Sequence, residues 1–130
     1  MLCVVHRAYL CKNRHSGREN VVKLILPHGG EHGEEFSEAV KETELQQRLA
    51  GSEFVASVYA WGTIAGQYLW VLMELCAGGS LESLIEKKHG TIDHEQRMAW
   101  CSQMALGLLH MHELLVMHRD VKPVRFTPAL

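Results

Sequence analysis

The order of strand-like and helix-like segments is the feature that most constrains the fold of this chain. Four β-prone apolar runs are separated by turn-forming residues, and they cover residues 4–11, 21–26, 54–63 and 67–75. Between the second and third runs, residues 34–49 contain many good helix formers and end just before Gly51. The tetrapeptide IAGQ joins the last two runs and indicates a hairpin.

After the glycine break CAGGS, the remaining segments have helical character. Residues 81–90 predict a short helix and residues 93–115 a longer one, for which Asp93 is the N-cap and Gln96 completes a capping box. Apolar and weakly polar side chains recur along the longer segment at helical spacing, namely Met98, Cys101, Ala105, Leu108, Leu109 and His112. Because the strands and helices are segregated along the chain, we expect an α+β fold with two lobes.

Composition excludes several classes of function. The chain has 130 residues, enough for one domain, and its formal net charge of −2 gives no basic field for nucleic acid or an anionic membrane. Its longest apolar run, YLWVLMELCA, is interrupted by Glu74 and is too short to cross a bilayer. The four cysteines form no C-x-x-C pair, so we expect reduced thiols and a cytoplasmic location.

The nine histidines do not predict a metal site. His112-Glu113 is followed by His118, six positions after the first histidine, whereas a zinc-protease helix needs the second histidine four positions on. His110 and His112 are two positions apart and so lie on nearly opposite sides of a helix. We therefore expect these histidines to be packed or exposed rather than metal ligands.

The segment NVVK is the first with a chemical interpretation. Phosphoryl transfer requires positioned charges, because the protein acts mainly by placing cations, metal-binding carboxylates and a base around the phosphate. Lys23 ends this strand-like segment, and Glu42 on the following predicted helix is in place to pair with it and hold the ammonium toward phosphates. The alternative is an ordinary surface ion pair, since a strand lysine and a helix glutamate occur in many folds.

The segment VMHRDVKP gives the second signal. Asp120 has the chemistry to accept a proton from a substrate hydroxyl, and Lys122 has the charge to neutralise a transferring phosphate. Pro123 would stiffen the loop, and His118 and Arg119 would support it. The alternative is a chance charged turn after a helix.

Taken in order, five segments resemble motifs of the eukaryotic protein kinase family. They are VVHRA, NVVK, FSEAVKETELQQRL, LWVLMELCAGGSL and LLHMHELLVMHRDVKP, which span residues 4–123 with approximately the family's spacing. The resemblance implies an N-lobe over residues 1–73, lacking the glycine-rich loop, and over residues 74–130 the hinge, the first helices of a C-lobe and the catalytic loop. It also implies ATP and Mg²⁺ as cofactors and a protein as substrate or partner.

The same resemblance assigns roles to individual residues. Asp120 corresponds to the catalytic base, and Lys122 to the phosphate-binding lysine of the serine/threonine type. The implied nucleotide-binding residues are Val5, Lys23, Glu42, the gatekeeper Met73, the Glu74 carbonyl and the Cys76 backbone. We expect these groups to converge around one nucleotide-sized cleft between the two lobes.

Departures from the family pattern put the chemistry in doubt. Cys3 stands where the last glycine of the glycine-rich loop is expected, and the sequence stops at Leu130, before any D-F-G. The pattern H-R-D-x-K-P-x-N requires asparagine five residues after Asp120, where this chain has Arg125, a cation in place of a magnesium ligand. Two milder departures are Gln46, at an interior position of the predicted helix, and Val21, in place of a small alanine.

Three interpretations follow. The first is a serine/threonine protein kinase-like chain, related to ATP-dependent phosphoryl transfer but inactive as an incomplete domain. The second is a non-catalytic kinase-like module that binds a protein partner, with Met98, Cys101, Ala105 and Leu109 in an exposed apolar patch. The third is an unrelated α+β protein whose motifs are coincidental.

Overall fold

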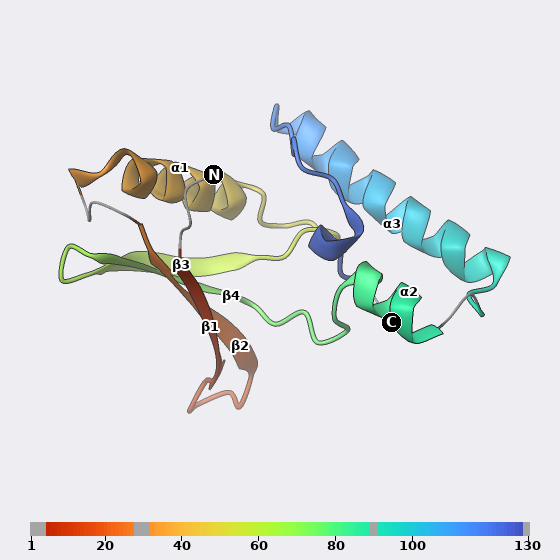
Figure 1. Cartoon of the computed structure of the whole chain (residues 1–130), viewed down its shortest axis with the longest axis horizontal. Coiled ribbons are helices and arrows are strands. Elements are labelled where there is room, and N and C mark those ends of the chain that lie inside the picture. The colour runs from red at the N-terminus through yellow and green to blue at the C-terminus, as the bar shows by residue number, and fades with distance from the viewer. Residues whose placement is uncertain (1–4, 28–31, 89–90, 129–130) are drawn as a thin grey trace. The chain divides into compact units, whose positions relative to one another are not determined.

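The structure is a computed structural model that describes residues 5–27, 32–88 and 91–128. The expectations for Val4, Cys3 and Leu130 lie outside these residues. The chain divides into two compact units, the first formed by residues up to Gly51 with Ala56–Leu75, and the second by Ser52–Val55 with the chain from Cys76 onward. Figure 1 shows the elements of both units, and each unit is described by itself.

An antiparallel sheet of four strands forms the first unit. The strands are β1 (Val5–Lys12), β2 (Glu19–Leu26), β3 (Val58–Ile64) and β4 (Tyr68–Glu74), in the spatial order β1-β2-β4-β3 (Figure 1). The helix α1 (Glu34–Arg48) lies between β2 and β3 in the sequence. Together with the helices of the second unit, this arrangement confirms the expected α+β class.

Two tight turns set the register of the sheet. Between β1 and β2, the side chain of Asn13 accepts hydrogen bonds from the amides of His15 and Ser16 at 2.9 and 3.0 Å, a typical turn-forming role for asparagine. Between β3 and β4, Ala65 and Gly66 have φ angles of 53° and 63°, and the amide of Gln67 donates to the carbonyl of Ile64 at 3.1 Å, so two left-handed residues form the turn. The hairpin predicted at IAGQ is thus confirmed.

The core of the first unit lies between one face of the sheet and α1. Its buried members are Ile25, Phe36, Val58, Leu69 and Val71, and Ala39, Val40, Trp61 and Met73 pack against them. Leu69 is fully buried, with 0% of its surface exposed, because β4 has a strand on each side and α1 over its face. The half-buried Gln46 of α1 donates a hydrogen bond to the backbone carbonyl of Ala56 at 3.3 Å, which explains how a polar side chain is accommodated there.

The second unit contains the helices α2 (Leu81–Lys88) and α3 (His94–Glu113) and the short 3₁₀ helix η2 (Pro123–Arg125). The carboxylate of Asp93 accepts a hydrogen bond from the amide of Gln96 at 2.7 Å, so the N-cap predicted from the sequence is present. The amide of Leu81 donates to the carbonyl of Phe126 at 2.7 Å, which ties the chain after η2 to the start of α2.

Gly107 on α3 packs against the backbone of the segment 52–55. A β-carbon at this position would lie 3.0 Å from the carbonyl oxygen of Phe54, closer than side-chain contacts normally come. We expect Gly107→Ala to lower the free energy of unfolding by up to about 2 kcal/mol, because overpacking costs about 1–3 kcal/mol and the higher helix propensity of alanine returns about 1 kcal/mol. Urea unfolding followed by helical circular dichroism measures the change.

The matched control for Gly107→Ala is Ser102→Ala on the exposed side of the same helix. Helix propensity alone predicts that both substitutions stabilise the protein. A gain of about 1 kcal/mol for Gly107→Ala, as this propensity predicts, would contradict the close contact with Phe54.

One face of α3 carries exposed apolar side chains. Met98 and Leu109 are each 52% exposed and Leu106 is 45% exposed, while Cys101 and Ala105 are exposed beside them. The exposure expected from the sequence is therefore confirmed for Met98, Cys101, Ala105 and Leu109, and Leu106 is a further exposed apolar residue of the helix. Within the part of the chain that the structure describes, none of the helices combines the length and the apolar character that crossing a bilayer requires.

Candidate functional site

Lys23 lies on the face of the sheet that α1 covers. In the register of the strands, Lys23 is opposite Val71, and its β2 neighbour Ile25 is opposite Leu69. Because strand side chains alternate between faces, Lys23 shares a face with these three residues, all of which belong to the core under α1. The half-buried Lys23 is therefore carried by an inner strand, on the apolar face of the sheet.

Glu42 is exposed on α1, directly before the buried Thr43. Lys23 takes part in a polar, ring or electrostatic interaction, and the ion pairs described in the structure do not include one with Glu42. The Lys23–Glu42 pair thus stays a prediction. The structure does place both residues in the same unit, one on the covered face of the sheet and the other on the covering helix.

The sheet register identifies a residue that the sequence interpretation missed. Val5 is opposite Leu26 in the register, and its side chain lies outside the part that the structure describes. Ala8 is directly opposite Lys23, so on β1 it is Ala8 that shares the face of the lysine.

The end of β4 holds the residues expected near an adenine ring. Met73 is half-buried against the core, and it is opposite Val21, which lies on the same face as Lys23. Apolar side chains beside a lysine fit a flat ring joined to phosphates. Glu74 fixes the strand end, since its carboxylate accepts from the Ser57 amide at 3.1 Å and its own amide donates to the Ser57 carbonyl at 2.9 Å.

The second unit carries the remaining predicted residues. Cys76 is exposed, and it is the first residue of this unit after β4, whereas Asp120 and Lys122 lie between α3 and η2. The expected convergence of Lys23 and Asp120 around one cleft stays a prediction, because the two residues belong to different units.

The loop that contains Asp120 begins at an unusual helix end. Leu115 takes up a left-handed conformation, with φ of 59°, and the amide of Val116 donates to the carbonyl of Met111 at 2.9 Å. This is a Schellman motif with leucine where glycine is usual. Val116 is buried and anchors the loop, while Leu115 is 93% exposed.

A second left-handed residue shapes the loop next to Asp120. Arg119 has φ of 61°, and the amide of Asp120 donates to Nδ1 of His118 at 3.2 Å. Left-handed non-glycine residues are uncommon and cluster at functional sites, where surrounding contacts hold them. This hydrogen bond is in line with the expectation that His118 supports the loop.

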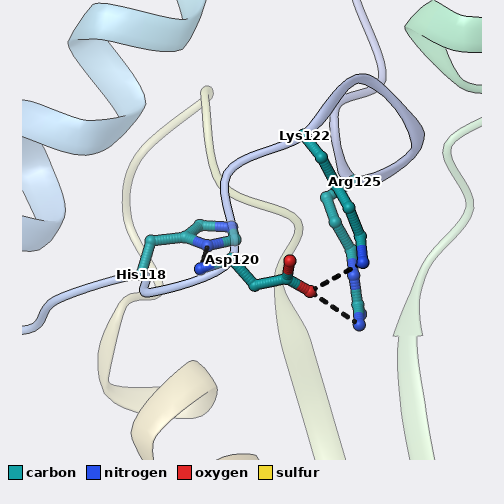
Figure 2. Close-up of polar contacts among 4 residues, drawn as sticks. All are labelled: His118, Asp120, Lys122 and Arg125. Atoms are coloured by element: carbon teal, nitrogen blue, oxygen red, sulfur yellow. Dashed lines mark hydrogen bonds and ion pairs between the residues drawn. The ribbon is translucent and has the colours of Figure 1, made fainter.

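Figure 2 shows that the side chains of Lys122 and Arg125 both reach the carboxylate of Asp120. Its Oδ2 atom is 3.0 Å from Nζ of Lys122 and 3.3 Å from Nη2 of Arg125. The three side chains are about half exposed, with exposed fractions of 48%, 46% and 56% in the order Asp120, Lys122 and Arg125. One carboxylate oxygen is therefore shared by two cations at the protein surface.

The two cations hold the pKa of Asp120 below its ordinary value. The hydrogen bond from Lys122 is the largest cause, and the positive charges of Lys122 and Arg125 act in the same direction against a smaller opposing effect of desolvation. The carboxylate is therefore ionised at neutral pH and is a weak proton acceptor. Because the carboxylate lies at the protein surface, solvent screens its ion pairs.

The residues of this loop do not fit a divalent metal ion. Magnesium prefers six oxygen ligands, of which proteins supply one or two carboxylates. The loop offers the single carboxylate of Asp120, and at Arg125 it presents a guanidinium that has donors only. In the described ranges, the structure contains no group of three histidine, cysteine or acidic side chains that could hold a metal ion.

Comparison with known proteins gives an independent result. The family model described as the protein kinase domain matches residues 5–125, which include Lys23, Glu42, Asp120 and Arg125.

Similar proteins include calcium-dependent protein kinase 10 of Oryza sativa subsp. japonica, which is 33% identical over 121 residues, 91% of this chain and 19% of that protein. Calcium-dependent protein kinase 26 of Arabidopsis thaliana is 31% identical over 125 residues, 91% of this chain and 24% of that protein. The serine/threonine-protein kinase Nek5 of Homo sapiens is 29% identical over 121 residues, 89% of this chain and 16% of that protein. The chain thus spans a quarter or less of the length of these relatives.

Proposed function

Because the chain belongs to the protein kinase family, we propose that it binds ATP through its first unit and derives from a serine/threonine kinase that transfers the γ-phosphate to protein hydroxyls. The observation that carries this proposal is the position of Lys23 on the covered face of the sheet, beside the apolar Val21 and Met73. A cytoplasmic location and a protein as substrate or partner are part of the same proposal.

In the proposed site, Lys23 binds the nucleotide phosphates and Glu42 orients it. Met73 limits the depth of the adenine site, and the Glu74 carbonyl and the Cys76 backbone are the hydrogen-bonding groups for the adenine edge. Val5 is the β1 residue that the family resemblance places beneath the nucleotide, and Ala8, opposite Lys23 in the register, is a second β1 candidate on the face of the lysine. This division of roles matches the chemistry of a phosphate-binding cation next to an apolar wall.

In the proposed catalytic loop, Asp120 is the base for the attacking hydroxyl and Lys122 neutralises the transferring phosphate. The hydrogen bond from Lys122 to the Asp120 carboxylate supports this pairing. The chain is nevertheless expected to be inactive in transfer. Arg125 occupies the position of a metal ligand, and loss of one electrostatic stabiliser of the transition state costs on the order of 10²–10³ in rate.

The test is transfer of radiolabelled γ-phosphate from ATP to a mixed protein substrate by the purified 130-residue chain. We expect no transfer above the level of the Asp120→Asn variant, whose side chain keeps the shape but not the charge. ATP binding is measured on the same samples by titration calorimetry. Transfer by the wild-type chain that Asp120→Asn abolishes would overturn the inactive assignment, and absence of ATP binding would overturn the nucleotide site.

The exposed apolar face of α3 favours a second candidate function, a non-catalytic module that binds a protein partner. Met98, Leu106 and Leu109 are each about half exposed, and exposed apolar patches commonly mark interaction sites. The two candidates differ in their dependence on nucleotide. A binding module retains its partner when Lys23 is substituted, whereas a nucleotide-dependent function does not.

A further inference from the structure

Arg125 does more than remove a metal ligand from the loop. Its Nη2 atom lies 3.3 Å from the same Asp120 oxygen that Lys122 contacts at 3.0 Å. The residues of η2 bring it there, because the amide of Arg125 donates to the carbonyl of Lys122 at 2.9 Å and closes a 3₁₀ turn. The side chain of Arg125, which stands where the family pattern has asparagine, therefore contacts the carboxylate of Asp120.

This cluster carries a net positive charge, whereas the ligands of a metal site carry a net negative charge. Two cations and one carboxylate give a net charge of +1, and Arg119 adds a further positive charge to the loop. A magnesium ion would sit about 2.1 Å from a carboxylate oxygen, and at Oδ2 it would have to displace a nitrogen that is already bound. A guanidinium has donors only, so Arg125 offers no ligand atom to a metal ion.

We infer that Arg125 takes the place of a divalent metal ion at this loop: its guanidinium is the fixed counter-ion of Asp120 and excludes the metal. The inference rests on the proposed function for the identity of the loop as a catalytic loop. It further implies that nucleotide binds this protein without a need for metal.

The experiment measures metal at the loop directly. Manganese(II) is titrated into the ¹⁵N-labelled 130-residue chain, and paramagnetic broadening of the amide signals of residues 118–125 is followed by NMR. In the wild-type protein we expect these signals to broaden at the same manganese concentration as the average surface amide. Arg125→Asn, which restores the residue of the family pattern, is expected to broaden them at roughly tenfold lower manganese concentration, because a unit charge has been removed close to the site.

Two further variants test whether the effect depends on a positive charge at position 125 or on the net charge of the protein. Arg14→Asn removes the same charge from the exposed β1–β2 turn and is expected to leave the loop signals unchanged. Arg125→Lys keeps the charge and is expected to behave as the wild type. Equal broadening in the wild type and Arg125→Asn, or none in either, would overturn the inference, provided that the amide spectrum shows both proteins folded.

ATP affinity is then compared in EDTA and in magnesium by titration calorimetry. We expect the wild type to bind ATP at least as tightly in EDTA as in magnesium. For Arg125→Asn we expect the ratio of ATP affinity in magnesium to that in EDTA to rise by about tenfold, the change expected above for manganese when the unit charge is removed. Binding by the wild type only with magnesium would overturn the inference and leave the proposed nucleotide site intact. Binding in neither condition would overturn the nucleotide site, while the manganese titration still decides the role of Arg125.

Discussion

Leu69→Ala is expected to lower the free energy of unfolding of the first unit by about 2–5 kcal/mol, the range for truncating a buried leucine to alanine. Leu69 has no exposed surface, and it is opposite Ile25 on β2 and Thr63 on β3. The substitution therefore leaves a cavity beside β4. Because β4 is hydrogen-bonded to β2 on one side and to β3 on the other, the strand cannot easily move to fill this cavity. Domains are typically stable by only about 5–15 kcal/mol, so much of the stability of this unit is at stake.

Urea unfolding followed by tryptophan fluorescence measures this change, because Trp61 and Trp70 lie on the strands of the first unit. The matched control is Leu10→Ala on β1, where the leucine is 64% exposed and the expected change is within about 0.5 kcal/mol. A loss below about 1 kcal/mol for Leu69→Ala, well under the usual range, would show that the core is not packed around this residue.

Local sequence signals predicted the elements of the fold well, because short-range geometry decides them. The IAGQ turn needs two residues with positive φ, and Ala65-Gly66 supplies them without help from the rest of the chain. The cap at Asp93 is equally local, since its carboxylate bonds an amide three residues away. Such features can be recognised from a few neighbouring residues.

Features that depend on contacts between distant segments were harder to predict. Gln46 interrupts an apolar pattern, and its role appears only when its side chain reaches the Ala56 carbonyl, ten residues on. The β1 residue opposite Lys23 depends on strand register, which pairs the lysine with Ala8. The role expected for Val5 stays a prediction. A slip of one residue in register moves every side chain of a strand to the other face of the sheet, so such a pairing is difficult to assign from local patterns.

Arg125 shows the same limit at the candidate site. The sequence identified it as a cation in the position of a metal ligand. It did not predict that the 3₁₀ turn would bring the guanidinium onto Asp120, because that contact depends on the backbone conformation of Lys122 and Pro123. The chemistry of the position was thus readable from the pattern, whereas the ion pair required coordinates.

Lys23→Met is expected to weaken ATP binding by at least tenfold. A charge-assisted hydrogen bond contributes about 1.5–3 kcal/mol, and each 1.4 kcal/mol is a factor of ten in affinity. Methionine keeps the length and the apolar stem of the half-buried lysine, so the fold of the sheet should be retained. Adenosine should bind both proteins equally, because it has no phosphates for the lysine to contact.

Titration calorimetry with ATP and with adenosine measures both effects on the same preparations. Lys41→Met, at an exposed position of α1, removes the same charge from a surface that makes no predicted nucleotide contact and should leave ATP affinity unchanged. Equal ATP affinity in Lys23→Met and the wild type would remove Lys23 from the nucleotide site. A loss of adenosine binding as large as the loss of ATP binding would instead mean that the lysine supports the site structurally, since a phosphate-binding cation affects only ligands that carry phosphates.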